Sequence, residues 1–261
     1  MGLADEGAKH GGWILCRRQD DHRVTRHAAN RGDYYWNIIN FGSLKDKDVL
    51  EIGVGNGSHA QLLAQHAGSF TGIDLTEYAV KSTTERMRCF GLNARVLRMD
   101  AENMEFADSS FDFIWTWGVI HHSSNTRRVL QEMHRVLRPG GTAITMLYHR
   151  SFWYYYILGG LINGVLRGQL LRTRSLHKIT QQMIDGALAR YYTIPEWKDM
   201  TSEFFDIEKI LIYGSKAEIV PLPGGAIKTA VMACIPNPLS RLLTNRLKMG
   251  YFLVSILKKP G

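Results

Sequence analysis

The sequence predicts an α/β protein with a doubly wound, mostly parallel sheet, and two observations carry that prediction. From residue 48 onward, short apolar runs typical of buried strands alternate with segments of helical periodicity. This alternation favours parallel strands joined by right-handed crossovers. In addition, the 261 residues and 45% hydrophobic content fit one folded domain with an appendage.

The expected elements follow one another in regular order. We expect strands at 48–53, 69–74, 94–100, 111–117 and 142–148, and helices at 58–67, 76–90 and 126–137. Thr76 is the expected N-cap of the second helix. The Arg-Pro-Gly-Gly run at 138–141 should end the third helix and turn the chain, because proline cannot continue a helix and glycine adopts left-handed geometry cheaply.

Residues beyond 150 break this rhythm. We expect a mainly helical, aromatic-rich cap inserted after the fifth strand, and then late strands of the same sheet at 206–214 and 251–259, the last one antiparallel. The expected regions are an N-terminal helical flank at 1–40, a core at 41–150, the cap and substrate region at 151–200, and C-terminal strands at 201–261.

Composition limits the partners and the location. The formal charge of +8 and pI near 9.4 favour an anionic partner, but no dense basic run concentrates the charge, so a generally cationic surface is expected. The three cysteines form no CxxC pair, and no metal is expected. The N-terminus lacks a signal-peptide pattern, which favours a cytoplasmic location. The apolar run 152–165 is shorter than the roughly 20 residues of a membrane span, so it predicts a buried lid helix or a membrane-peripheral anchor.

The run VLEIGVGNGSHA at 49–60 places three alternating glycines between a strand and a helix. Without a Cβ, Gly53, Gly55 and Gly57 allow a tight turn and close approach of a ligand to the backbone. Asp74 ends the second strand, where its carboxylate can accept hydrogen bonds from ribose hydroxyls. These features suit NAD as well as other nucleosides.

Two further acidic residues distinguish between NAD and other nucleosides as the ligand. Asp100 ends the third expected strand, at the same sheet edge, where it could accept a hydrogen bond from an adenine amino group. Glu51 lies inside the first strand, where a carboxylate needs a partner or a nearby cation. A positively charged nucleoside suits this acidic setting better than a pyrophosphate does.

The motifs EIGVGNG, GIDL, MDAENMEF, FDFIWTWGVIHH and HRVLRPGG, in unbroken order over about residues 35–150, resemble the class I S-adenosylmethionine-dependent methyltransferases. WGVIHHSSNT and MLYHRS are most similar to the "type 11" small-molecule subgroup. The resemblance implies a Rossmann-like fold and S-adenosylmethionine as cofactor. By this resemblance the cofactor's methionine part lies along Glu51, Gly53, Gly55 and Gly57, its ribose at Asp74 and Leu75, its adenine at Asp100, Ala101 and Glu102, and its sulfonium above Trp117 and Gly118.

Three histidines are candidate general bases for an acceptor that must lose a proton. His121 and His122 follow the fourth strand, and His149 follows the fifth. Alternatively, the histidine pair shapes its loop, and positioning alone supplies the rate. Candidates for the acceptor pocket are aromatic: Tyr34, Tyr35, Trp153, Tyr154 and Tyr191. Core packing explains these side chains equally well.

The leading hypothesis is methyl transfer to a small-molecule acceptor, such as a natural product or a quinone-like or lipid-linked compound, by a monomer or homodimer. RNA methylation is an alternative that the charge favours. However, no Asn/Asp-Pro-Pro-Tyr type of run follows the fourth strand and no RNA-binding module is recognisable, so nucleic acid is not the expected partner. A non-catalytic cofactor-binding scaffold is the third reading.

Overall fold

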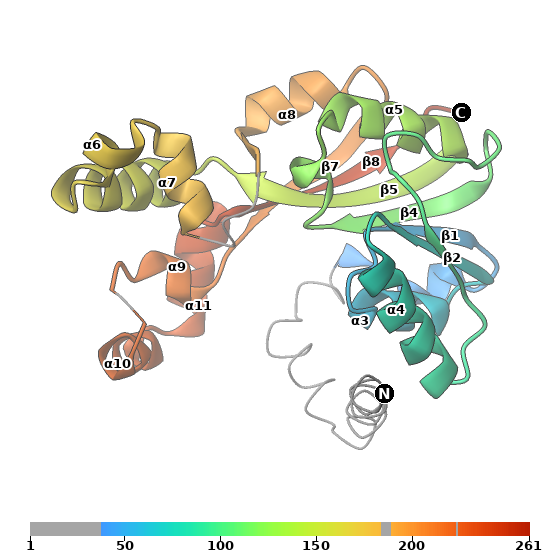
Figure 1. Cartoon of the computed structure of the whole chain (residues 1–261), viewed down its shortest axis with the longest axis horizontal. Coiled ribbons are helices and arrows are strands. Elements are labelled where there is room, and N and C mark those ends of the chain that lie inside the picture. The colour runs from blue at the N-terminus through green and yellow to red at the C-terminus, as the bar shows by residue number, and fades with distance from the viewer. Residues whose placement is uncertain (1–37, 184–188, 223) are drawn as a thin grey trace, which may run out of the picture. The chain divides into compact units, whose positions relative to one another are not determined.

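The computed structural model describes residues 38–183, 189–222 and 224–261 (Figure 1). The predicted N-terminal flank, with Tyr34 and Tyr35, therefore lies almost wholly outside the described residues. The strand order is β3-β2-β1-β4-β5-β8-β7, and β6 pairs with β5. No helix among the described residues is both long enough and apolar enough to cross a bilayer.

The strands confirm the predicted sheet. Their bounds are β1 Asp48–Ile52, β2 Ser69–Asp74, β3 Arg95–Arg98, β4 Phe111–Trp117, β5 Leu137–His149, β6 Tyr191–Tyr192, β7 Asp206–Tyr213 and β8 Phe252–Lys258. β1 and β3 both pair in parallel with β2, whereas β8 is antiparallel to β5 and β7. The arrangement is a Rossmann-like, mostly parallel sheet with an antiparallel last strand.

The helices of the first half also follow the sequence pattern. The predicted helices correspond to α3 Ser58–Ala64, α4 Glu77–Cys89 and α5 Thr126–Val136, whereas the short helices η2 Phe41–Leu44 and η3 Ile120–His122 were not predicted. The Thr76 hydroxyl accepts a hydrogen bond from the Ala79 N–H at 3.3 Å, which confirms the predicted cap. The turn predicted at 138–141 is instead part of β5, although the pairing of β5 with β8 starts only at Thr142.

The second half is richer in helix than the sequence suggested. After β5 come the π-helix η4 Phe152–Leu166, α6 Gln169–Thr173, α7 Leu176–Gln182 and α8 Ile194–Thr201. Between β7 and β8 lie α9 Lys216–Ile219, α10 Ala226–Cys234, α11 Asn237–Arg241 and η5 Leu242–Arg246, which the strand pattern did not predict. The helical cap after the fifth strand is confirmed.

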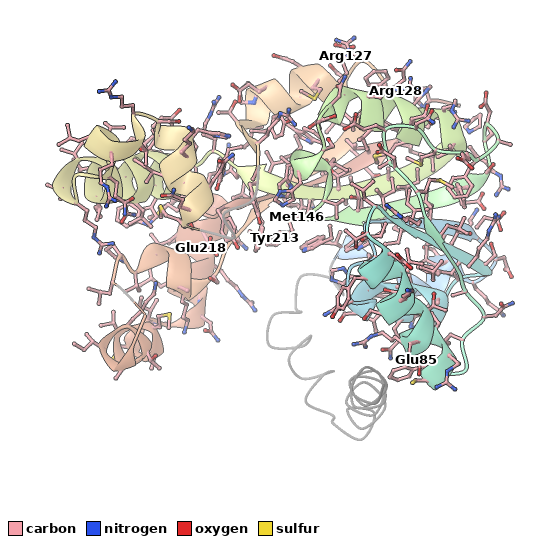
Figure 2. All side chains as sticks on the ribbon, in the orientation of Figure 1. Glu85, Arg127, Arg128, Met146, Tyr213 and Glu218 are labelled. Carbon is pink, nitrogen blue, oxygen red and sulfur yellow. The ribbon has the colours of Figure 1, made fainter. Side chains whose placement is uncertain are left out.

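The chain divides into two compact units, each described here by itself. Of the described residues, unit 1 contains those up to Trp115 together with Arg135–Gly141, and unit 2 contains those of Thr116–His134 and Thr142–Gly261. Unit 1 buries Leu50 and Ile73 of its parallel strands, and unit 2 buries Leu253 and Leu257 of β8. In unit 2, Arg127 and Arg128 project from α5 (Figure 2) and form ion pairs with Glu203 and Glu132.

Candidate functional site

The glycine loop of unit 1 connects β1 to α3 and is bent at each glycine. Gly53, Gly55 and Gly57 have φ angles of 82°, 53° and 78°, in the left-handed region that glycine adopts most readily. A Cβ built on Gly57 would lie 2.9 Å from Thr83 Oγ1, whereas one built on Gly55 would meet nothing within 4 Å. Gly57 is therefore required by packing, and Gly55 leaves space beside the backbone.

Asp74, at the end of β2, holds this loop in place. One carboxylate oxygen accepts a hydrogen bond from the Gly55 N–H at 3.1 Å. The other accepts from the N–H and the hydroxyl of Thr76, both at 2.9 Å. Thr83 of α4 donates its hydroxyl to the Gly55 carbonyl at 3.2 Å. The predicted glycine and acid positions are thus brought together in one hydrogen-bonded edge.

The residues after β3 join the same edge. The Met99 N–H donates to the Asp74 carbonyl at 3.0 Å, so Asp100 follows directly beside the end of β2. The Asp100 carboxylate accepts from the Glu102 N–H at 2.9 Å, which fixes a turn around Ala101. Leu75, at 64% exposed, and Tyr78, at 80% exposed, place apolar surface next to Asp74.

Glu51 is the most costly group in unit 1. Its side chain is 1% exposed, and its Oε2 has no hydrogen-bond partner among the described residues. Burial, together with the negative charge of Asp74, raises the pKa of Glu51 well above its usual value. His59 Nδ1 lies 3.8 Å from Glu51 Oε1, but burial lowers the pKa of His59 to about 4, so the ring is neutral near pH 7 and does not balance a charged Glu51.

This edge of unit 1 suits a cationic ligand with an apolar ring. The buried acid favours a nearby positive charge, Asp74 and Asp100 supply acceptors, and exposed Leu75 and Tyr78 can contact a flat base. Unit 1 also has a cavity of about 530 Å³, but Asp48, Ser69 and Arg95 line it. Those residues begin β1, β2 and β3, and the cavity runs from there along β3 to Arg98 and Met99 at its carboxyl end.

The three candidate histidines belong to unit 2, as do Trp117 and Gly118. His121 is completely buried, neither ring nitrogen has a hydrogen-bond partner among the described residues, and its ring lies 4.0 Å from that of Tyr148. Burial and the neighbouring His122 lower the pKa of His121 well below its usual value. Gly118 has φ 75° and donates its N–H to Met146 of β5 at 3.1 Å.

His149 is held differently. Its Nδ1 lies 3.0 Å from the Gly250 carbonyl, which can only accept, so Nδ1 carries the proton and Nε2 is left as an acceptor. Burial lowers the pKa of His149, and the hydrogen bond to Gly250 partly offsets that effect. β6 runs beside the end of β5, pairing Tyr191 with Tyr148 and Tyr192 with His149. The N–H of Arg190 donates to the His121 carbonyl at 2.9 Å, so β6 also fixes the histidine loop.

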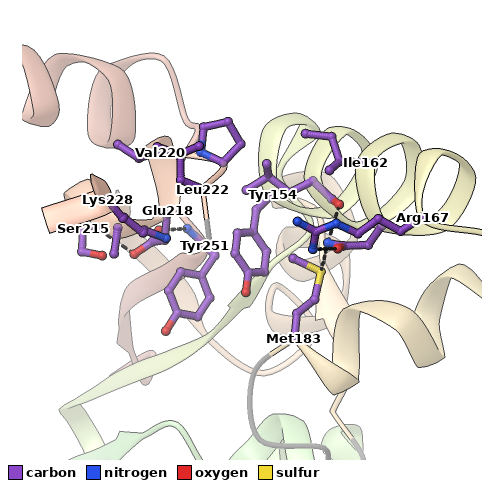
Figure 3. A pocket seen from close by; sticks show the side chains of 14 residues that line it. Tyr154, Ile162, Arg167, Met183, Ser215, Glu218, Val220, Leu222, Lys228 and Tyr251 are labelled. Atoms are coloured by element: carbon purple, nitrogen blue, oxygen red, sulfur yellow. Dashed lines mark hydrogen bonds between the residues drawn. The ribbon is translucent and has the colours of Figure 1, made fainter. Parts of the chain in front are cut away.

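Unit 2 contains a cavity of about 500 Å³ between η4, α9 and α10 (Figure 3). The rings of Tyr154 and Tyr251 stack at 5.1 Å within its lining. Apolar side chains dominate the rest of the wall: Leu158, Ile162, Met183, Val220 and Leu222. Charged side chains lie on both sides of the cavity: Arg167, Lys228 and Glu218. Burial raises the pKa of Glu218 to about 7, and its oxygens accept from the N–H groups of Ser215 and Tyr251.

The predicted pocket residues of unit 2 occupy different surroundings. Tyr154 lines the cavity. Trp153 donates its indole N–H to the Glu218 carbonyl at 2.9 Å. Tyr191 is buried in the aromatic cluster around Tyr148 and donates its hydroxyl to the Thr180 carbonyl at 3.1 Å. Of these three, only Tyr154 lines the cavity.

Sequence reasoning missed the residues that support the loops. Thr83 and Arg86 lie three apart on α4 and bond the carbonyls of Gly55 and Asn56. Their spacing on one helix face can be read from the sequence, but the carbonyl groups that they contact cannot. Arg190, which also donates to the carbonyls of Ser123 and Ser124, follows no local motif.

The fold is that of an α/β protein, and unit 1 carries an acidic, glycine-rich edge. Residues 50–145 match the family described as "Methyltransferase domain". The segment is therefore similar to a methyltransferase domain, in agreement with the resemblance of its motifs to the class I, type 11 group. The matched residues include the glycine loop, Asp74, Asp100 and the histidine pair.

Two curated relatives resemble part of the chain. The phthiotriol/phenolphthiotriol dimycocerosates methyltransferase of Mycobacterium tuberculosis is 42% identical over 100 residues, which is 38% of this chain and 36% of the relative. The demethylmenaquinone methyltransferase of Geobacillus kaustophilus is 28% identical over 123 residues, 43% of this chain and 53% of the relative. The chain thus spans about a third to a half of the length of these relatives.

Solved structures agree on the fold. The S-adenosylmethionine-dependent methyltransferase from Mesorhizobium loti superimposes with a TM-score of 0.59 at 15% identity. The superposition covers 87% of this chain and 96% of that one. At this identity the likeness supports the fold alone.

Proposed function

We propose that the protein transfers a methyl group from S-adenosylmethionine to a lipophilic small molecule. The observation that carries the proposal is the buried Glu51, whose Oε2 has no hydrogen-bond partner among the described residues, beside a loop with open space at Gly55. A pyrophosphate would bring further negative charge next to Glu51 and Asp74. A cationic nucleoside relieves that repulsion.

When bound, S-adenosylmethionine would supply an electrophilic methyl group: the acceptor atom would bond to the methyl carbon in line with the carbon–sulfur bond, which breaks to release S-adenosylhomocysteine. Glu51 favours the positive charge of the cofactor, and Gly53, Gly55 and Gly57 admit its amino-acid part. Asp74 accepts from the ribose, Leu75 contacts the nucleoside, and Asp100, Ala101 and Glu102 hold the adenine. Trp117 and Gly118 remain candidates for contact near the sulfonium. These assignments combine the motif resemblance with the contacts that the residues of unit 1 make.

The acceptor class rests on the cavity of unit 2. Its wall is mainly apolar, with stacked tyrosines and with Arg167 and Lys228 as cations, which suits an amphiphile with an apolar body and an anionic or strongly polar group. Relatives that match part of the chain are named for a mycocerosate lipid and for a menaquinone precursor. We assign the acceptor to this cavity, with Tyr154 as a wall residue.

Filling the cavity tests that assignment. Ile162→Trp adds bulk to the wall and should raise the KM for a lipophilic acceptor about tenfold, while S-adenosylmethionine affinity stays unchanged. Its neighbour Leu161 is exposed and does not line the cavity, so Leu161→Trp is the matched control. Equal KM values for the two variants would place the acceptor elsewhere. Steady-state kinetics at saturating cofactor provide the measurement.

Among the candidate bases we favour His149 and His122 over His121. His121 has a strongly lowered pKa, which makes it a weak base at neutral pH, and its ring is buried against Tyr148. By contrast, the fixed tautomer of His149 leaves Nε2 free to accept a proton. Substitution of the catalytic base by glutamine should lower kcat about 100-fold or more and leave the affinity for the cofactor unchanged. Full turnover in all three single variants would leave positioning as the source of rate.

The decisive activity experiment follows S-adenosylhomocysteine formation by the full chain with lipophilic hydroxylated and quinol acceptors. We expect acceptor-dependent product formation. Tight cofactor binding without product over a broad acceptor panel would instead support the scaffold reading.

A further inference from the structure

The positive charge of this protein is concentrated in two segments of unit 2. Residues 152–183 and 219–249 contain no aspartate or glutamate, and we call them together the basic lobe. Its cationic residues are Arg167, Arg172, Arg174, Lys178, Lys228, Arg241, Arg246 and Lys248. The chain has 32 basic and 24 acidic residues, so these eight account for the net charge of +8 and the remainder is balanced.

The exposed apolar surface is concentrated in the same lobe. Apart from Leu75 and Tyr78, every exposed large hydrophobic side chain in the described part of the chain belongs to it. Phe152, Leu171 and Ile227 are 73%, 86% and 75% exposed, respectively. Soluble surfaces rarely gather such side chains without a function.

The two segments form one connected body. η4 packs against α6, α7 and α9, and α9 in turn contacts α10 and η5. Figure 1 shows α6 and α7 near each other, as it does α9, α10 and α11. Glu218, the acid that precedes the second segment, is 6% exposed and contributes little negative surface. The lobe therefore presents cations and apolar side chains together.

We propose that the basic lobe binds the surface of an anionic lipid bilayer. Lys and Arg are attracted to anionic headgroups, and exposed Phe, Leu and Ile insert at the boundary between headgroups and acyl chains. A nucleic acid would meet the charge but does not call for so many exposed aliphatic side chains, and the apolar core of a protein interface is usually depleted of lysine. The combination of full charge segregation and apolar exposure favours the membrane surface. This inference does not depend on the assignment of methyl transfer.

Vesicle flotation of the full chain tests the proposal. Binding to vesicles of phosphatidylcholine with about one third phosphatidylglycerol should exceed binding to pure phosphatidylcholine at least about tenfold. Raising the salt concentration should weaken it, because ionic screening shortens the reach of the cations. Leu171→Asp and Arg172→Glu on α6 should each lower the partition coefficient about tenfold.

Matched controls lie in unit 1. Lys45→Glu makes the same charge change as Arg172→Glu, and Tyr78→Asp removes an equally exposed apolar side chain; both should bind vesicles as the wild type does. Thermal unfolding confirms that each variant is folded. The proposal is overturned if the wild type does not prefer anionic vesicles, if lobe and control variants bind equally, or if the chain binds an RNA oligonucleotide but no vesicle.

Discussion

Asp74→Ala should weaken S-adenosylmethionine binding about 10- to 100-fold, equivalent to ~1–3 kcal/mol, the range for loss of charge-assisted hydrogen bonds. The substitution removes an acceptor for the ribose and also releases the loop, because Asp74 accepts from the Gly55 N–H and from Thr76. Isothermal titration calorimetry measures the affinity directly.

Asp108→Ala is the control for the Asp74 variant. Asp108 is an aspartate of unit 1 that is exposed and paired with Arg135, so its removal changes the net charge equally without touching the glycine loop. Its affinity for S-adenosylmethionine should remain that of the wild type. Unchanged affinity in Asp74→Ala would remove the ribose assignment.

Glu51→Gln should change cofactor affinity and stability in opposite directions. Glutamine cannot take on the negative charge that a bound cation would favour at this position, so S-adenosylmethionine binding should weaken about tenfold or more. The cofactor-free protein should become more stable near pH 7, because glutamine is neutral without binding a proton, whereas buried Glu51 must take one up on folding. A gain of about 1 kcal/mol would raise the Tm by a few degrees.

The pH dependence follows from the raised pKa of Glu51. Above pH 4.5 the unfolded chain loses this proton while the folded chain keeps it, so the stability that the neutral acid contributes is lost as pH rises through the folded pKa. The Tm difference between variant and wild type should therefore grow as the pH rises above 4.5 and level off above the folded pKa. Identical pH profiles would contradict the charge assignment.

Glu218→Gln is the matched control for Glu51→Gln. Glu218 is also buried with a raised pKa, but both of its oxygens have backbone partners, from Ser215 and Tyr251. We expect its substitution to alter stability and leave cofactor affinity unchanged. An equal loss of affinity in both variants would show that buried charge in general, and not the position of Glu51, sets binding.

Sequence periodicity predicted the sheet well because its strands carry their own signals. The apolar runs at 69–74 and 111–117 coincide with β2 and β4. β6 has only two residues and forms by pairing with β5, so no local pattern marks it. The short helices α9 to η5 were missed because Pro221, Gly225 and Pro236 interrupt that stretch and favour loops.

Parts of the site could be predicted from the sequence where a single residue type indicates the structural constraint. A glutamate in a buried strand is costly wherever it points, and three alternating glycines before a helix indicate a close turn. By contrast, the bonds from Thr83 to Gly55 and from Arg190 to His121 join residues distant in sequence. The first segment of the basic lobe overlaps the apolar run 152–165, predicted as a lid helix or a membrane-peripheral anchor, whereas the second segment was missed because only the fold brings it beside the first.

The most direct measurement is calorimetric titration of the full chain with S-adenosylmethionine and, separately, with NAD. Saturable binding of one equivalent of S-adenosylmethionine, much tighter than NAD and weakened by Glu51→Gln, is the expected result. Preferential binding of NAD, or no saturable binding of the sulfonium nucleoside, would contradict the proposed site.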